Sequence, residues 1–93
     1  MSCYIITYDL KTKSGVSRSS DYSDLHEVIK SYKTWAKLTE SSYAIVSEKK
    51  ATEVRDHIKK LLKKGDRLFV VKSSGIGAWS NVKCSSEWLK ENL

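Results

Sequence analysis

Tyr4-Ile5-Ile6-Thr7-Tyr8-Asp9-Leu10 is the stretch that decides the fold, because it predicts the first strand of a sheet. Its residues are largely β-branched or aromatic and include no Pro or Gly, which is typical of a strand rather than a helix. The strand delivers Asp9 to its C-terminal edge. A basic, Ser-rich loop over residues 11–20 follows, so the carboxylate faces cationic side chains. This pairing is suited to a divalent cation and a phosphate.

The length of 93 residues predicts a single domain over residues 1–93, with no room for a second core. The chain carries 17 Lys and Arg against 11 Asp and Glu, a formal net charge of +6. An excess of this sign favours polyanionic partners such as nucleic acid, or an acidic protein surface. A charge of this size also keeps a small domain soluble, so charge alone does not decide the partner.

The two cysteines, Cys3 and Cys84, lie near opposite ends of the chain. Neither has a neighbour at metal-ligand spacing, which argues against a zinc site. The N-terminus lacks the apolar run of a signal peptide, and no segment approaches the length of a membrane span. We therefore expect a cytoplasmic protein with no membrane partner and with both thiols reduced; a Cys3–Cys84 bridge stays open as an alternative.

Two amphipathic helices are predicted after the first strand. The first runs from about residue 22 to residue 34, with Asp21 as its N-cap. Its apolar face comprises Leu25, Val28, Ile29, Tyr32 and Ala36. The second has Lys63 and Lys64 in its last turn and Gly65 as a left-handed stop. The apolar stripe of this second helix comprises Ala51, Val54, Ile58, Leu61 and Leu62.

Further strands are predicted between and after these helices. Residues 35–38 and 42–47 are strand segments, and residues 39–41 form either a bulge or a tight bend between them. The result is either one kinked strand or two paired ones. Residues 68–71 are predicted to form a buried strand, and residues 76–79 a last edge strand.

A short helix beginning at residues 86–90 completes the chain. The order is therefore β-α-β(β)-α-β, followed by a short strand and a helix. Two helices crossing one face of a mainly antiparallel sheet give an α+β fold of the ferredoxin-like plait type. This fold hosts many functions and proves none of them.

Asp9 is the first candidate site residue, as a ligand for Mg²⁺ or Mn²⁺ and as a catalytic group. One carboxylate binds such ions poorly, so a symmetric dimer would have to supply a second Asp9 from the partner. The alternative is a strand-end residue that starts the turn by bonding backbone amides. Spacing alone favours this second interpretation.

Lys11, Lys13 and Arg18 are candidates for holding a nucleic-acid backbone, each neutralising one phosphate. A solvated loop is an equally weighted alternative. Lysines on the back and end of the second helix are interpreted instead as dipole partners and solvent face. They are Lys59, Lys60, Lys63 and Lys64.

The aromatic residues Trp35, Trp79 and Trp88 are predicted to lie in the core or at a subunit contact, and we assign Trp79 and Trp88 to a dimer contact. His26 and His57 have side chains suited to acid–base work near neutrality. Both are predicted to be partly exposed helical histidines without a catalytic role.

Several stretches together resemble the small SinR-like proteins, which are similar in turn to the CRISPR-associated endoribonuclease-like integration subunits and to the virulence-associated D toxins. The resemblance extends over nearly the whole chain. Besides the amphipathic helix after Ser47, the matching stretches are the first strand ending in Tyr8-Asp9-Leu10, Lys30-Ser31-Tyr32 leading to Trp35, Ser41-Ser42-Tyr43-Ala44-Ile45, Asp66-Arg67-Leu68-Phe69-Val70 and Ala78-Trp79.

This resemblance implies a ferredoxin-like homodimer with a nucleic-acid partner. It further implies that Asp9 matches the aspartate that holds a metal between the subunits in nuclease members. Three functions stay open. The preferred one is a nucleic-acid-binding homodimer without assured catalysis, and the second is a magnesium-dependent endonuclease for RNA or DNA with paired Asp9. The third is a protein-interaction module, such as an inhibitor or toxin–antitoxin partner, that uses the terminal helix and Trp88.

Overall fold

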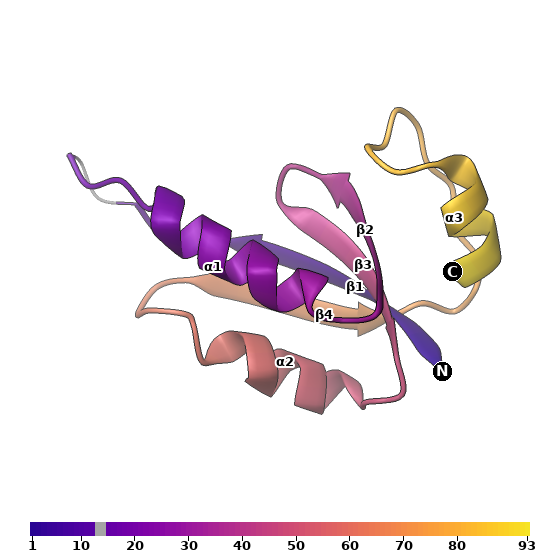
Figure 1. Cartoon of the computed structure of the whole chain (residues 1–93), viewed down its shortest axis with the longest axis horizontal. Helices are drawn as coiled ribbons and strands as arrows, with labels where there is room; N and C mark the ends of the chain where they lie inside the picture. The colour runs from indigo at the N-terminus through magenta and orange to yellow at the C-terminus, as the bar shows by residue number, and fades with distance from the viewer. Residues whose placement is uncertain (13–14) are drawn as a thin grey trace.

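The computed structural model describes residues 1–12 and 15–93, and four antiparallel strands form its sheet in the order β2-β3-β1-β4 (Figure 1). β1 is central and pairs with β3 on one side and β4 on the other, so β2 and β4 are the edges. The strands are β1 (Ser2–Asp9), β2 (Thr34–Thr39), β3 (Ser42–Ser47) and β4 (Arg67–Lys72).

Two helices, α1 (Ser19–Lys30) and α2 (Ala51–Lys59), cover one face of this sheet (Figure 1). This arrangement confirms the predicted ferredoxin-like plait. The helices bury the apolar stripes that the sequence predicted, because Leu25 and Ile29 of α1 and Val54 and Ile58 of α2 are almost or fully inaccessible. Burial of each such side chain contributes about 1.5–3 kcal/mol.

Alternation along β1 divides the sheet into two chemically different faces. Tyr4, Ile6 and Tyr8 point toward the helices and belong to the hydrophobic core. Ile5, Thr7 and Asp9 therefore point to the opposite face, which we call the open face. Strand pairing extends the open face across β4, because the partners of these residues are Val71, Phe69 and Arg67.

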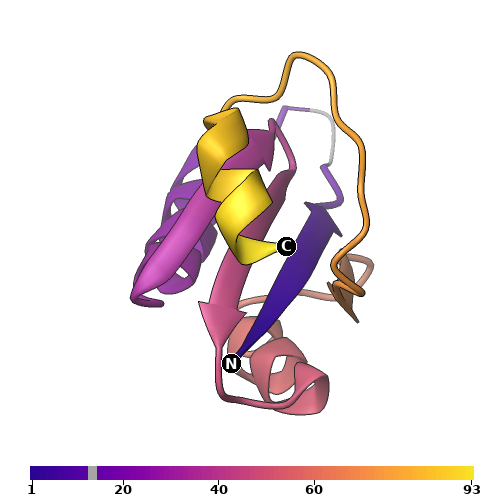
Figure 2. The same cartoon turned by 90° about the vertical axis from the view of Figure 1, so that its right-hand side faces the viewer.

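A C-terminal segment of residues 73–93, which includes α3 (Ser86–Asn92), covers part of the open face (Figure 2). The Ser73 N–H donates to the Cys3 carbonyl at 2.8 Å, and the Lys83 N–H donates to the Leu38 carbonyl at 3.0 Å. The Lys83 ammonium also pairs with Glu40 at 2.8 Å. These contacts attach the segment to both β1 and the β2–β3 hairpin.

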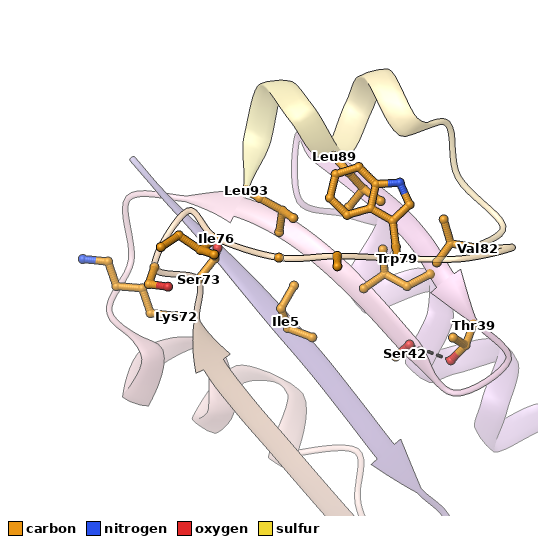
Figure 3. A pocket seen from close by; sticks show the side chains of 14 residues that line it. Ile5, Thr39, Ser42, Lys72, Ser73, Ile76, Trp79, Val82, Leu89 and Leu93 are labelled. Carbon is orange, nitrogen blue, oxygen red and sulfur yellow. Dashed lines mark hydrogen bonds between the residues drawn. The ribbon is translucent and has the colours of Figure 1, made fainter.

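A mainly apolar cavity of about 440 Å³ lies between the segment and the sheet. Figure 3 shows Ile5 of β1 pointing up toward Leu93, with Trp79 and Leu89 beside it. Leu89 is buried, so α3 contributes to a small second core. The cavity is open to solvent, so the segment covers this part of the sheet incompletely.

The predicted boundaries of the first helix are wrong at both ends. Arg18, not Asp21, occupies the N-cap position, and no side chain caps the helix there. Asp21 lies inside the first turn, where its carboxylate accepts a hydrogen bond from Arg18. At the other end Tyr32 follows the helix and Ala36 lies in β2; both are buried, which extended the apparent helical pattern too far.

The hairpin prediction resolves into two paired strands, β2 and β3, with a register shift between Lys37 and Thr39. The second helix ends at Lys59, so placing Lys63 and Lys64 in its last turn was wrong. Both residues lie in the turn that leads to β4. Gly65 does take the left-handed conformation (φ 90°), but within this turn.

Two expectations about the C-terminal third are also wrong. The run over residues 68–71 forms an edge strand whose side chains are not all buried, because Phe69 and Val71 face the open side. Residues 76–79 form a loop over the sheet and not an edge strand. The terminal helix is confirmed as α3 and is capped by the Ser85 side chain, which accepts from the Trp88 N–H at 3.1 Å.

Candidate nucleic-acid interface

Asp9 ends β1 on the open face, and its side chain is 70% exposed. Its register partner on β4 is Arg67, whose Nη1 lies 3.9 Å from the Asp9 carboxylate. Two exposed groups at this separation attract each other weakly. The carboxylate is therefore accessible to a ligand or to a second copy of the chain.

A single chain does not by itself fit a magnesium centre. Within residues 1–12 and 15–93, no three His, Cys, Asp or Glu side chains gather closely enough to hold a metal ion. Asp9 contributes one carboxylate, and its nearest charged neighbour, Arg67, is a cation that opposes a bound metal. A Mg²⁺ ion held by protein takes one or two carboxylates and several waters. A second carboxylate would therefore have to come from another molecule.

Arg18 is almost wholly buried and forms ion pairs in the structure. Its guanidinium donates to both oxygens of Asp66, at 2.5 and 2.9 Å, and to Asp21 at 2.9 Å. A further bond of 2.8 Å reaches the Lys11 carbonyl. We call this set of contacts the Arg18 clamp. It fixes the start of α1 against the turn before β4, so the donors of Arg18 already have protein acceptors.

Asp66 is the main acceptor of the Arg18 clamp. Its side chain is fully inaccessible and also accepts the backbone N–H groups of Lys11 and Lys63, at 2.9 and 2.8 Å. The hydrogen bonds from Arg18, with those from the backbone, hold the pKa of the Asp66 carboxyl well below its usual range. The hydrogen bonds to Asp66 and to Asp21 raise the pKa of Arg18. Both groups are therefore charged throughout the neutral range.

Around this clamp, lysines from two loops line a hollow of about 340 Å³, which we call the basic hollow. Lys11 enters from the end of β1, and Lys63 and Lys64 enter from the turn before β4. These segments lie at the same end of the molecule as the start of α1 (Figure 1). The remaining lining residues are Val16, Ser17, Arg18 and Asp21.

Gly65 helps to place Lys11 in the hollow. A Cβ at Gly65 would lie 2.7 Å from the Lys11 Cδ, so the lysine stem crosses directly over the glycine. The positive φ of Gly65 and this close approach both favour glycine. Lys13, the third loop cation predicted to hold phosphate, lies outside the described residues.

The two histidines lie on the helix-covered side of the sheet. The His26 Nε2 is 2.7 Å from the Tyr8 hydroxyl, and the His57 Nδ1 is 3.0 Å from the Tyr32 hydroxyl. Burial, with Lys37 and Lys30 nearby, lowers the pKa of His26. Both histidines are on the helices that cover the face opposite Asp9, so neither joins Asp9.

Trp79 and Trp88 make contacts within their own chain. The Trp79 indole N–H donates to the Ser86 hydroxyl at 3.1 Å, and its ring lines the cavity under the C-terminal segment (Figure 3). Trp88 lies half-buried on α3. The large apolar side chains left uncovered on the open face are instead Phe69, 60% exposed, and Val71, 41% exposed.

The sequence reasoning therefore missed four residues of interest. Lys63 and Lys64 were assigned to a helix end, although Gly65 directly after them signals a turn as well as a helix stop. Phe69 and Val71 were assigned to the interior, because a run of four apolar residues does not reveal that its strand lies at a sheet edge.

Comparisons with known proteins inform the fold alone. No known family profile matches the chain, and no curated protein sequence matches it. A crystal structure of a hypothetical protein, TT1823, from Thermus thermophilus is similar, with a TM-score of 0.65 and 19% sequence identity. The similarity covers 89% of this chain and 95% of the other.

Both cysteines are free thiols, and none of the described helices is long and apolar enough to cross a membrane.

Proposed function

We propose that this protein binds nucleic acid as a homodimer, with the basic hollow and its surroundings contacting the phosphate backbone. The observation that carries the proposal is the convergence of Lys11, Lys63 and Lys64 at the end of the sheet where β1 and Asp9 end. Arg67 adds a fourth exposed cation at this end. Exposed lysines and arginines that neutralise phosphates supply most of the affinity in sequence-independent binding.

The charge balance of this end supports a polyanionic partner. Asp66 and Asp21 offset Arg18 and part of Lys63, whose ammonium lies 3.3 Å from Asp21. Lys11 and Lys64 form no ion pair with another residue of the described ranges, so their charges are available to a ligand. The overall excess of six positive charges acts in the same direction at longer range.

The uncovered edge of the open face supports the homodimer. Phe69 and Val71 lie beside Thr7 and Ile5 of β1, in the same row as Asp9. Exposed aromatic and aliphatic side chains on one surface mark interaction sites more often than scattered residues do. A two-fold pairing of these rows whose axis passes near the Asp9 end would bring two Asp9 carboxylates toward each other.

The test is binding of a labelled oligonucleotide, measured by fluorescence anisotropy over a series of salt concentrations. We expect the logarithm of affinity to fall linearly with the logarithm of salt. Lys11→Gln should reduce the slope by about 0.7–0.9, the value for one lost phosphate contact. Lys60→Gln is the matched control, because Lys60 is exposed but does not line the hollow. Absence of binding at about 50 mM salt would contradict the proposal and leave the protein-interaction module.

A magnesium-dependent nuclease is the second candidate, and the exposure of Asp9 favours it. Two facing copies would supply the two carboxylates that one chain lacks, and a bound Mg²⁺ would supply the activation of water. Asp9→Asn keeps the size of the side chain and removes its charge. Under this candidate the variant loses magnesium-dependent cleavage of RNA or DNA and keeps its affinity. If the wild-type protein binds RNA or DNA but does not cleave it with Mg²⁺ or Mn²⁺, its function is binding alone.

A further inference from the structure

We infer that the basic hollow is a site for a phosphate monoester, the dianionic group found at the end of a nucleic-acid strand. This inference deepens the proposed function and rests on it. The ligand of the hollow is then the terminal phosphate of a nucleic-acid strand, and not any phosphate of its backbone.

The charge of the hollow matches a dianion. Its four cations, Lys11, Arg18, Lys63 and Lys64, are opposed by Asp21 on its wall and Asp66 behind it, which leaves an excess of two positive charges. A phosphate monoester carries between 1.5 and 2 negative charges at neutral pH, by the general rule for this group. An internal phosphodiester carries one. The electrostatic match is therefore better for the chain end.

The shape of the hollow also favours an end group. Three segments form its walls: the end of β1 at Lys11, the loop over residues 16–18, and the turn at Lys63 and Lys64. An internal phosphate has chain attached on both sides and must fit lengthwise along a surface. A terminal phosphate needs room on one side only, and the volume of about 340 Å³ admits it with water or part of its sugar.

The clamp makes the hollow a preformed site. Asp66 holds Arg18, the Lys11 N–H and the Lys63 N–H at once, so all three walls are tied to one buried carboxylate. Lys11 is further directed by its passage over Gly65. Because the backbone of each wall is already fixed, binding orders only the lysine side chains, which lowers the entropic cost of association.

The ammonium groups have suitable chemistry for the three terminal oxygens. Each lysine offers three N–H donors, and charge-assisted hydrogen bonds to phosphate are about twice as strong as neutral ones. The Ser17 hydroxyl, which lines the hollow, donates to the Ser19 hydroxyl at 3.2 Å and can rotate to donate to a ligand.

The experiment compares a 5′-phosphorylated oligonucleotide with its 5′-hydroxyl twin, alongside a 3′-phosphorylated one, by fluorescence anisotropy. We expect the wild-type protein to bind one of the phosphorylated strands about tenfold more tightly than the hydroxyl strand, because the end group adds charge-assisted bonds. Lys64→Gln should remove most of this preference. Lys60→Gln, an equal loss of charge outside the hollow, should keep it.

The outcomes separate this inference from the proposed function. Equal affinity for phosphorylated and hydroxyl strands, at an affinity that still depends on salt, overturns the phosphate-monoester site and leaves the nucleic-acid proposal standing. No binding to any strand contradicts the proposed function, and calorimetry with inorganic phosphate then decides the site. If wild-type protein releases or absorbs heat on binding phosphate and Lys64→Gln does not, the hollow is a site for a soluble phosphate. If wild-type protein shows no heat of binding, the inference is overturned as well.

Discussion

The two faces of the sheet differ in what their side chains do. On the helix-covered face, Ile6 and Ile45 are fully buried between the sheet and α1 and α2. On the open face, the C-terminal segment covers β2, β3 and part of β1, while Phe69 and Val71 stay exposed along β4. The comparison shows that the helix-covered face holds the main core of the fold, whereas the open face has surface left for a partner.

The largest effect is expected from a cavity on the helix-covered face. Ile45→Ala removes a fully buried side chain from β3 and should lower the free energy of unfolding by about 2–5 kcal/mol. Val71→Ala, the matched change on the open face, should cost less than about 1 kcal/mol, since its side chain is already partly in water. Urea denaturation at low protein concentration measures both. Similar losses would show that the two faces contribute equally to stability.

The next effect concerns the Arg18 clamp, at the end of the sheet that carries the basic hollow. Asp66→Asn leaves the buried guanidinium of Arg18 without its bidentate partner and should destabilise the protein clearly at pH 7. Glu48→Gln, a change at an exposed acid, is the control and should have little effect.

The loss of stability in Asp66→Asn should depend on pH, and the direction follows from the pKa shift of Asp66. The pKa of Asp66 is lowered on folding, so its charge stabilises the folded state above the unfolded pKa of about 3.9. As pH falls below that value toward the lower folded pKa, the contribution is lost. The difference in stability between wild type and Asp66→Asn should therefore shrink as the pH falls below about 4. A difference that stays constant with pH would contradict the ion-pair explanation.

On the open face, Phe69→Ser should weaken the proposed dimer without weakening the fold. Removal of an aromatic side chain at the centre of an interface typically raises the dissociation constant by tenfold or more, about 2 kcal/mol. Ile76→Ser is the control, because Ile76 is also highly exposed but lies on the C-terminal segment. Sedimentation equilibrium gives both constants. Equal dimerisation of Phe69→Ser and wild type would rule out the β4 row as the interface.

The smallest effect is expected at Trp79, for which the sequence predicts a dimer contact. Trp79→Phe removes the indole N–H that donates to Ser86 and should cost about 0.5–1.5 kcal/mol of stability. The proposed dimer should persist, because the ring faces the cavity beneath its own chain. If the Trp79→Phe dimer dissociates while the free energy of unfolding is unchanged, Trp79 lies at the subunit interface.

The sequence predicted most elements in the correct order because periodicity reports local structure directly, although it added an edge strand over residues 76–79 where the structure has a loop. The residues over 42–47 and the stripe through Val54 and Ile58 have unambiguous patterns, and their elements are confirmed. What failed depended on contacts distant in sequence. Arg18 became a buried clamp only because Asp66, 48 residues away, lies beneath it, and no local pattern records that pairing.

The candidate site was predictable to a similar extent. Asp9 could be placed at an exposed strand end from sequence, and Lys11 at the start of a basic loop. The approach of Lys63 and Lys64 to Lys11 depends on the antiparallel pairing of β1 with β4, which sets the end of one strand beside the start of the other. The exposure of Phe69 likewise depends on tertiary structure, because its side chain points to the part of the open face that the C-terminal segment leaves uncovered.

The most direct test of the central proposal is the mass of the protein in solution, measured by light scattering with and without an oligonucleotide. One chain has a mass of 10.6 kDa, so the account predicts a free species of twice that mass and a complex that adds oligonucleotide to the same two chains. A species of 10.6 kDa at every protein concentration, or a mass that does not change when the oligonucleotide is added at low salt, would contradict it.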